Sequence, residues 1–132
     1  MKTGCDNIVL QSVKSDKEIL EEEWKSINMN SIEYSIFKIQ KRIFEAEKEG
    51  NYRKANSLAR MLVNDNRSLI HAINVVTKKN KGKRTSGTDG MVIKNDGERM
   101  ALFYKLKDYK IGLHNPKPVR RVYIPKKNGA TR

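Results

Sequence analysis

The stretch NSIEYSIFKIQKRIFEAEKEG, residues 30–50, predicts the first long helix of the chain. Asn30 is a good N-cap, and Glu33 three residues later completes a capping-box pattern. Isoleucines follow at steps of four, three and four residues, with two phenylalanines beside them: Ile32, Ile36, Ile39, Ile43, Phe37 and Phe44. This spacing puts the apolar side chains on one face of an amphipathic helix. Gly50 then provides a left-handed stop.

Three further helices are predicted after this one. A helix from about residue 51 to 63 buries Tyr52, Ala55, Leu58, Ala59 and Leu62. Another starts near Ser68, after the break Asn64-Asp65-Asn66, and its apolar stripe is Leu69, Ala72, Ile73 and Val76. The last is capped by Asn95-Asp96-Gly97, runs from Glu98 to Tyr109, and points Met100, Phe103, Leu106 and Tyr109 inward. The short links favour antiparallel neighbours, so we expect a mainly α fold with a small bundle of three to four helices.

A basic loop separates the third helix from the fourth. Residues 78–84, KKNKGKR, hold five basic side chains in seven positions, and TSGTDG follows at residues 85–90. Such a stretch has no apolar face and predicts a flexible cationic loop. We assign residues 81–95 to this Gly-rich loop.

The end of the chain, PVRRVYIPKKNGATR at residues 118–132, predicts a β-hairpin. Val119–Ile124 is rich in β-branched and aromatic residues, and Asn128-Gly129 is a strong signal for a type I′ turn. The hairpin makes the expected fold α+β overall. Because the sequence stops almost before a second strand begins, we expect the chain to be part of a longer protein.

Charge is distributed unevenly along the 132 residues. The whole chain carries a formal net charge of +13, but residues 1–23 are net −3 and the remainder is net +16. A positive field favours binding of a polyanion, and nucleic acid is the first candidate. Residues 1–23 are expected to be a weakly ordered acidic lead-in, with a helical turn or two between Asp16 and Trp24. Trp24, the single tryptophan, is expected to be a buried anchor that pins this segment to the helix of residues 30–50, and not a base-stacking side chain.

Several of these stretches resemble the N-terminal region of reverse transcriptases and maturases encoded by group II introns. At the end of the chain the resemblance rests on Pro118 to Lys126, with Asn128-Gly129 and Arg132, and in the loop on Thr85-x-Gly87-x-Asp89-Gly90. Three earlier motifs add to it: Trp24-x-x-Ile27-Asn28, Ile39-Gln40-x-Arg42-Ile43, and Ala72-x-x-x-Val76-Thr77-x-x-Asn80-x-Gly82. Met29, Ile39 and Thr88 stand where that family usually has tryptophan, leucine, and valine or isoleucine. The resemblance implies that residues 24–80 are a helical N-terminal extension domain and that residues 96–132 start the polymerase fingers, ending before the palm.

Intron RNA is the partner that the resemblance implies, together with the remainder of a reverse transcriptase. Our candidate RNA-binding residues are basic positions on the first long helix, the loop and the hairpin: Lys38, Lys41, Arg42, Lys78, Lys79, Lys81, Lys83, Arg84, Arg120 and Arg121. The alternative is an unrelated small basic protein, such as a helical DNA-binding domain. That alternative predicts a recognition helix with exposed polar residues, whereas here the basic residues cluster beyond the end of the third helix.

Polymerase chemistry is not expected of this chain by itself. It requires paired carboxylates that hold two divalent metals, and the acids here are scattered, so we predict no catalytic residue and no metal site. In the full-length family Mg²⁺ and a deoxynucleoside triphosphate are bound; the resemblance assigns nucleotide contacts to Lys126 and Arg132, only together with a palm. One cysteine and no long apolar run fit a cytoplasmic protein without a membrane partner.

Overall fold

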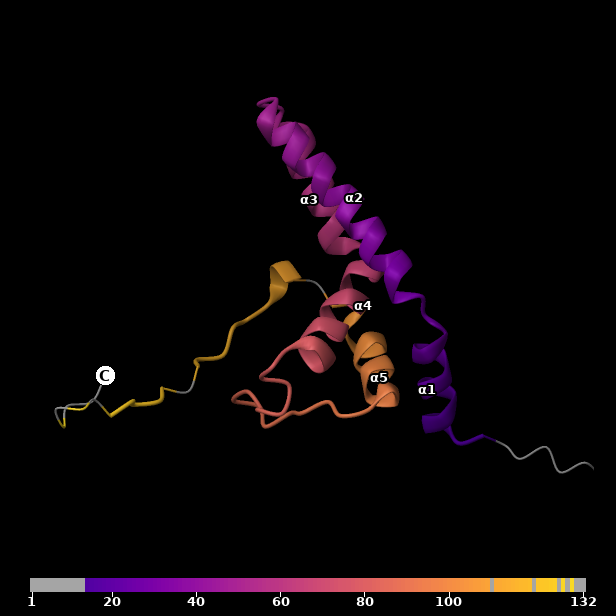
Figure 1. Cartoon of the computed structure of the whole chain (residues 1–132), viewed down its shortest axis with the longest axis vertical. Coiled ribbons are helices and arrows are strands. Elements are labelled where there is room, and N and C mark those ends of the chain that lie inside the picture. The colour runs from indigo at the N-terminus through magenta and orange to yellow at the C-terminus, as the bar shows by residue number, and fades with distance from the viewer. Residues whose placement is uncertain (1–13, 110, 120, 126, 128, 130–132) are drawn as a thin grey trace, which may run out of the picture.

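The computed structural model describes residues 14–109, 111–119, 121–125, 127 and 129. This part contains five α-helices, one π-helix and one 3₁₀-helix (Figure 1). In chain order they are α1 (Asp16–Ser26), α2 (Met29–Lys48), α3 (Tyr52–Asn64), α4 (Asn66–Asn74), the π-helix Val75–Lys79, α5 (Asp96–Leu106) and the 3₁₀-helix Ile111–Leu113. The mainly α prediction is confirmed, and the bundle has one α-helix more than the largest number expected.

The hydrophobic core lies where α1, α4 and α5 meet. Trp24 of α1 is only 3% exposed and packs in one cluster with Ile73, Met100 and Phe103. Partly buried side chains surround the cluster: Leu20, Ile27, Met29, Leu69, Ile70 and Leu102. Burying this apolar surface is the main force that holds the three helices together. Trp24 is buried as predicted, but its buried partners belong to α4 and α5 and not to the helix that the prediction named.

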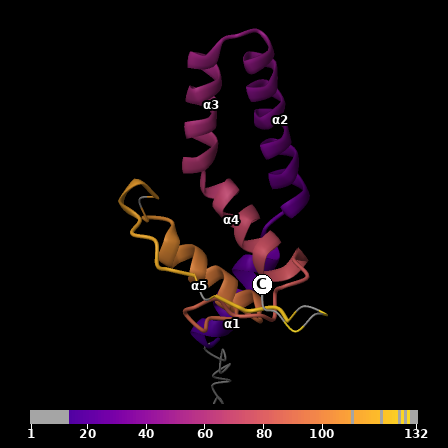
Figure 2. The ribbon, with the colours of Figure 1, turned by 90° about the vertical axis from the view of Figure 1, so that its left-hand side faces the viewer.

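Helices α2 and α3 form an antiparallel hairpin that extends away from this core (Figures 1 and 2). Ile32, Ile36 and Ala46 of α2 are buried, as are Ala55 and Leu58 of α3. Gly50 joins the two helices at a φ of +73°, and its N–H donates to Glu47 O at 3.0 Å. The predicted left-handed stop is therefore confirmed.

The start of α2 differs from the prediction. Asn28, not Asn30, is the N-cap, because its Oδ1 accepts from the Ser31 N–H at 3.1 Å. The earlier start brings Met29 into the helix, where it packs against the Trp24 cluster. Glu33 is consequently a full turn inside α2 and closes no capping box. The capping box of this region belongs to α1, between Ser15 and Glu18.

Asp65 alone separates α3 from α4. Its backbone N–H donates to Leu62 O at 3.3 Å, and its Oδ1 accepts from the Arg67 N–H at 2.9 Å. One residue thus ends one helix and caps the next, so α4 begins at Asn66 rather than near Ser68. The predicted break is confirmed, although it is shorter than expected.

Several side chains predicted to face inward are exposed instead. They are Phe37 and Phe44 of α2, Tyr52 of α3, Ala72 and Val76 of the third predicted helix, and Tyr109 after α5. Val76 lies in the π-helix, whose wider turn replaces the 3.6-residue period on which its position was predicted. Tyr109 is exposed because α5 ends at Leu106, and its ring packs edge-on to His114 at 5.8 Å between centroids.

Residues 80–95 connect the π-helix to α5 without a regular helix or strand, as expected of the basic loop. The β-hairpin is not shown. Gly129 has the positive φ, +77°, that a type I′ turn requires, and within residues 121–125 only Pro125 forms an isolated bridge. Residues 130–132, where the second strand was predicted, lie outside the described residues.

Candidate nucleic-acid interface

The π-helix Val75–Lys79 starts the basic segment of the chain. The Asn80 N–H donates to Val75 O at 2.8 Å, which is the five-residue step that defines a π turn. Thr77 is buried by this turn, and its hydroxyl donates to Ile73 O at 2.6 Å. Lys78 and Lys79 remain exposed on the outside of the same turn. The π turn therefore directs a hydroxyl inward and two ammonium groups outward.

Arg99 of α5 joins the two ends of the loop from inside. Its side chain is buried, its Nε–H donates to Thr77 Oγ1 at 2.8 Å, and one Nη2–H group donates to Thr77 O at 3.3 Å. Nη2 also donates to Lys94 O at 3.4 Å, and Nη1 donates to Asp96 Oδ1 at 2.6 Å. Because Thr77 lies just before the loop and Lys94 lies near its end, one guanidinium holds the chain at both ends of the loop.

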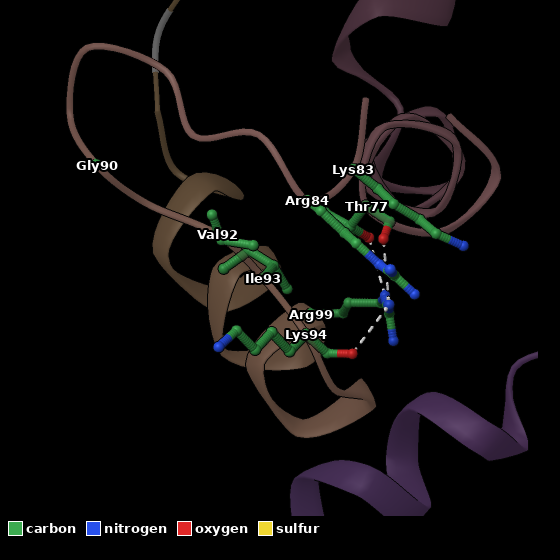
Figure 3. A pocket seen from close by; sticks show the side chains of 8 residues that line it. All are labelled: Thr77, Lys83, Arg84, Gly90, Val92, Ile93, Lys94 and Arg99. Carbon is green, nitrogen blue, oxygen red and sulfur yellow. Dashed lines mark hydrogen bonds between the residues drawn. The ribbon is translucent and has the colours of Figure 1, made fainter. Parts of the chain in front are cut away.

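An open hollow of about 700 Å³ lies beside this junction (Figure 3). Its lining comes from the π-helix, the loop and α5: Thr77, Lys83, Arg84, Gly90, Val92, Ile93, Lys94 and Arg99. In Figure 3 the Arg84 side chain extends from the loop toward the guanidinium of Arg99, with Lys83 beside it, while the ammonium of Lys94 points away along the opposite rim. Within the described residues, Lys83, Arg84 and Lys94 form no ion pair.

Two lysines of the basic segment already have partners in the fold. The Lys79 ammonium donates to Glu33 Oε1 on α2, and this hydrogen bond holds the pKa of the Glu33 carboxyl below its ordinary value. Lys83 Nζ donates to the backbone oxygen of Lys78 at 3.1 Å, which leaves its charge unpaired. Lys79 is therefore less available to a phosphate than the other basic side chains of the segment.

The basic residues predicted on α2 form a separate group. Lys38, Lys41 and Arg42 are exposed, and they line a second hollow of about 360 Å³ together with Tyr34, Phe37 and Glu45. This hollow shares no lining residue with the one beside Arg99. The structure thus places Lys83 and Arg84 beside one hollow and the three basic residues of α2 beside another.

The remaining predicted residues lie toward the end of the chain. Lys81 is exposed in the loop, and Arg121 is exposed in the segment that follows the 3₁₀-helix Ile111–Leu113. Arg120, Lys126 and Arg132 lie outside the described residues, so their predicted roles stay predictions. The loop residues Lys83 and Arg84 are brought together with two cations that were not predicted, Lys94 and Arg99.

A sequence signal for Arg99 does exist. Arg99 occupies the face of α5 that carries Met100 and Phe103, and it follows Asp96 by three residues, within reach of an ion pair on a helix. An arginine on an apolar face next to a matched carboxylate indicates a buried ion pair. Lys94 carries no comparable signal, because its basic neighbours in the hollow, Lys83 and Arg84, lie much earlier in the same loop.

Metal ligation finds no support in the described part of the chain, where no group of three His, Cys, Asp or Glu side chains could hold an ion. The Mg²⁺ of the full-length family thus has no fitting ligand set among these residues. None of the helices described combines the length and the apolar character needed to cross a bilayer.

A family model for the N-terminal domain of reverse transcriptase matches residues 24–106 and places the chain in a known class. The match begins at Trp24 in the core and ends at Leu106, the last residue of α5, and so includes the basic loop and Arg99. The chain belongs to this family of reverse transcriptase N-terminal domains. Comparison with curated proteins and with solved structures gave no match.

Proposed function

We propose that this chain is the N-terminal region of a group II intron reverse transcriptase and maturase, and that it binds intron RNA through its basic loop. The family membership supports the first part, and the resemblance of the hairpin sequence at residues 118–132 favours a group II intron source. The finer assignment to intron RNA, and to splicing, is our inference.

The observation that carries the proposal is the convergence of Arg84 on Arg99. Two guanidinium groups that approach each other repel, unless an anion lies near them. Asp96 compensates Arg99, whereas Arg84 has no carboxylate partner in the described part of the chain. A phosphate of an RNA backbone, gripped by the planar fork of Arg84, would supply the missing negative charge.

The DNA-binding alternative finds less support. A recognition helix needs exposed polar side chains that can reach base edges in the major groove. Helix α4 has nine residues, buries Ile73 and Asn74, and its Arg67 is held by Asp65 at 2.8 Å. Cations on an irregular loop suit recognition of RNA by backbone and shape.

A titration over a range of salt concentrations tests the proposal. We expect a structured RNA hairpin to bind, with the logarithm of its affinity falling by about 0.7–0.9 per decade of salt for each phosphate contact. Changing Lys83, Arg84 and Lys94 to glutamine should lower both the affinity and this slope. Fluorescence anisotropy of labelled RNA measures both quantities.

A variant with the same net charge provides the control. Lys14, Lys17 and Lys25 lie at or on α1, far along the chain from the loop, and all three are exposed. Changing these three to glutamine should leave the affinity nearly unchanged. Equal losses in the two triple variants, or equal binding of the hairpin and of heparin, would show only a general attraction to polyanions and would contradict the proposal.

A further inference from the structure

The outer face of α2 carries three exposed aromatic rings. Tyr34 and Phe37 are each 61% exposed and Phe44 is 68% exposed, although α2 is packed against α3 on its other side. At 100° per residue the three rings lie roughly 120–160° around the helix from the centre of the stripe formed by Ile32, Ile36 and Ala46, which are buried. Tyr34 to Phe44 spans ten residues, or about 15 Å along the helix axis. Tyr34 and Phe37 line one hollow, and Phe44 lies about two turns further along the same side of α2; we call these three residues the aromatic strip.

Cations border this strip on the same helix. Lys38 Nζ lies 4.8 Å from the centroid of the Tyr34 ring, in a cation–π arrangement. Lys41 and Arg42 line the same hollow as Tyr34 and Phe37. Between residues 34 and 48 there are four basic and two acidic side chains, and Glu45 comes within 4.0 Å of Lys41 only at the edge of ion-pair distance. Aromatic and positive side chains thus alternate on this side of α2.

This combination fits one kind of partner better than others. An acidic protein surface would pair with the lysines but would offer no planar groups to the rings. Unpaired nucleotides offer both, because every base has a flat face that stacks on an aromatic ring and every nucleotide carries a phosphate. Paired bases are already stacked inside a duplex and cannot use the rings.

We propose that the outer face of α2 binds unpaired RNA bases, which stack on Tyr34, Phe37 and Phe44 while Lys38, Lys41 and Arg42 contact their phosphates. This inference rests on the proposed function, since it assigns a second surface to the same RNA ligand. The loop beside Arg99 holds backbone of any structured RNA, and the strip on α2 adds a preference for RNA that contains a single-stranded segment.

The experiment compares two labelled RNA hairpins that differ only in their loops. One has a run of unpaired adenosines containing 2-aminopurine, and the other is closed by a minimal tight turn. Leucine at positions 34, 37 and 44 preserves apolar surface but removes the π faces. We expect Tyr34→Leu, Phe37→Leu and Phe44→Leu together to weaken binding of the first hairpin about tenfold or more and to leave binding of the second unchanged.

The fluorescence of 2-aminopurine provides a direct readout of stacking. It should change when the original protein binds the adenosine loop, and this change should disappear in the triple leucine variant. Tyr52→Leu is the matched control, because Tyr52 is an equally exposed ring, at 62%, that belongs to α3 and not to the strip. Tyr52→Leu should preserve both the affinity and the fluorescence change. Circular dichroism confirms that the variants keep their helices.

Other outcomes would overturn the inference. If the triple variant binds both hairpins like the original protein, with the fluorescence change intact, the strip does not contact bases. If the original protein self-associates in sedimentation experiments and the triple variant does not, the strip is an interface between copies of this chain. Failure of the proposed function would look different, because neither hairpin would then bind in a salt-dependent way.

Discussion

Arg99 is a buried cation whose hydrogen-bond partners are two backbone oxygens, one hydroxyl and one carboxylate. Its guanidinium serves Thr77, Lys94 and Asp96 at once, with 6% of the residue exposed. A buried charge costs free energy unless such partners surround it, and removal of one partner leaves the others unsatisfied. Arg99 is therefore needed for the local fold of the loop, whatever it contributes to binding.

Replacing Arg99 with methionine should destabilise the protein. The change keeps much of the apolar stem but leaves the Thr77 carbonyl and the Asp96 carboxylate without their donor, so the free energy of unfolding should fall by about 2 kcal/mol. Urea denaturation followed by circular dichroism measures this. Arg60→Met on α3 is the control, since Arg60 is exposed and its change should stay within about 0.5 kcal/mol. Equal stability of the two variants would contradict the role assigned to Arg99.

At the level of single residues, the sequence predicts best where local chemistry decides the outcome. Gly50 ends α2 because the backbone there has a positive φ, which glycine adopts without strain. Trp24 is buried because no other side chain offers as much apolar surface. Asn28 was missed because Asn28 and Asn30 are equally good caps. The choice between them depends on Met29 reaching the core, which is a contact between distant parts of the chain.

Among the elements, the junction of α3 and α4 depends most on one side chain. The Asp65 carboxylate caps α4 and pairs with Arg67 at 2.8 Å, and this hydrogen bond lowers the pKa of Asp65 below its ordinary value. A carboxyl whose pKa is lowered by folding stabilises the folded state at neutral pH. That stability declines as the pH falls below the unfolded pKa, about 3.9, and through the folded pKa.

Asp65→Ala should therefore lower the free energy of unfolding at neutral pH by about 1 kcal/mol, which is typical of a lost N-cap. Asp65→Asn keeps the cap but loses the charge, so its cost at neutral pH should be smaller. The difference between the original protein and Asp65→Asn should shrink as the pH is lowered from about 5 toward 2. Urea denaturation at several pH values checks both statements, and a difference that grows with acid would contradict them.

The contact between α1 and α5 depends on a residue without a side chain. A Cβ atom added to Gly97 would lie 3.1 Å from Glu21 Cγ and 3.3 Å from the Lys17 backbone oxygen. The Glu21 side chain can move away, but the α1 backbone can move only if the two helices separate. Gly97 thus sets how closely the first turn of α5 approaches α1.

Gly97→Ala should lower the free energy of unfolding by about 1 kcal/mol, although alanine favours a helix more than glycine does. Thermal unfolding provides the measurement. Gly82→Ala is the control, because an added Cβ there meets only Asn80 Oδ1 at 3.9 Å, and its effect should be close to zero. A gain in stability for Gly97→Ala would show that the helices tolerate the extra atom.

The bounds of a helix could be predicted where they depend only on the spacing of apolar residues within that segment. Helix α3 lies within one residue of its predicted bounds, because Asn51 caps it and the Ala55–Leu58 face is regular. The π turn after α4 could not be predicted, since it depends on Thr77 reaching Arg99 across the loop. Phe37 and Phe44 are predicted to face inward because each directly follows an isoleucine of the stripe, but that single step turns the side chain about 100° away from it. Both rings are exposed, and no helix among the described residues covers that side of the α2–α3 hairpin.

At the scale of the whole molecule, the distribution of charge along the chain matters more for binding a polyanion than the net charge does. The first 23 residues are net −3, and part of them forms α1, whereas residues 78–84, at the end of the π-helix and in the loop that follows, carry five cations in seven positions. The sequence alone predicts this segment as a basic RNA-binding site. It could not show that Lys79 is paired with Glu33 or that Arg99 stands behind Arg84, because both facts depend on how the helices pack.

The loop and the end of the chain should contribute differently to RNA binding. Among the basic residues of positions 78–84, Lys79 is the one that is paired with the Glu33 carboxylate. The others can contact phosphates without first breaking that pair: Lys78, Lys81, Lys83 and Arg84. Neutralising these four with glutamine should lower the slope of log affinity against log salt by up to about three, because each lost phosphate contact removes one counterion-release term.

Lys126→Ala with Arg132→Ala should change RNA affinity only slightly, because the resemblance assigns these two residues to a nucleotide pocket that a palm would complete. Fusing a palm from a related reverse transcriptase should make the same double change raise the Michaelis constant for nucleotide. Anisotropy titrations of the isolated chain and primer extension by the fusion measure the two effects. Loss of RNA binding in the double alanine variant, with a silent loop variant, would instead locate the RNA site at the end of the chain.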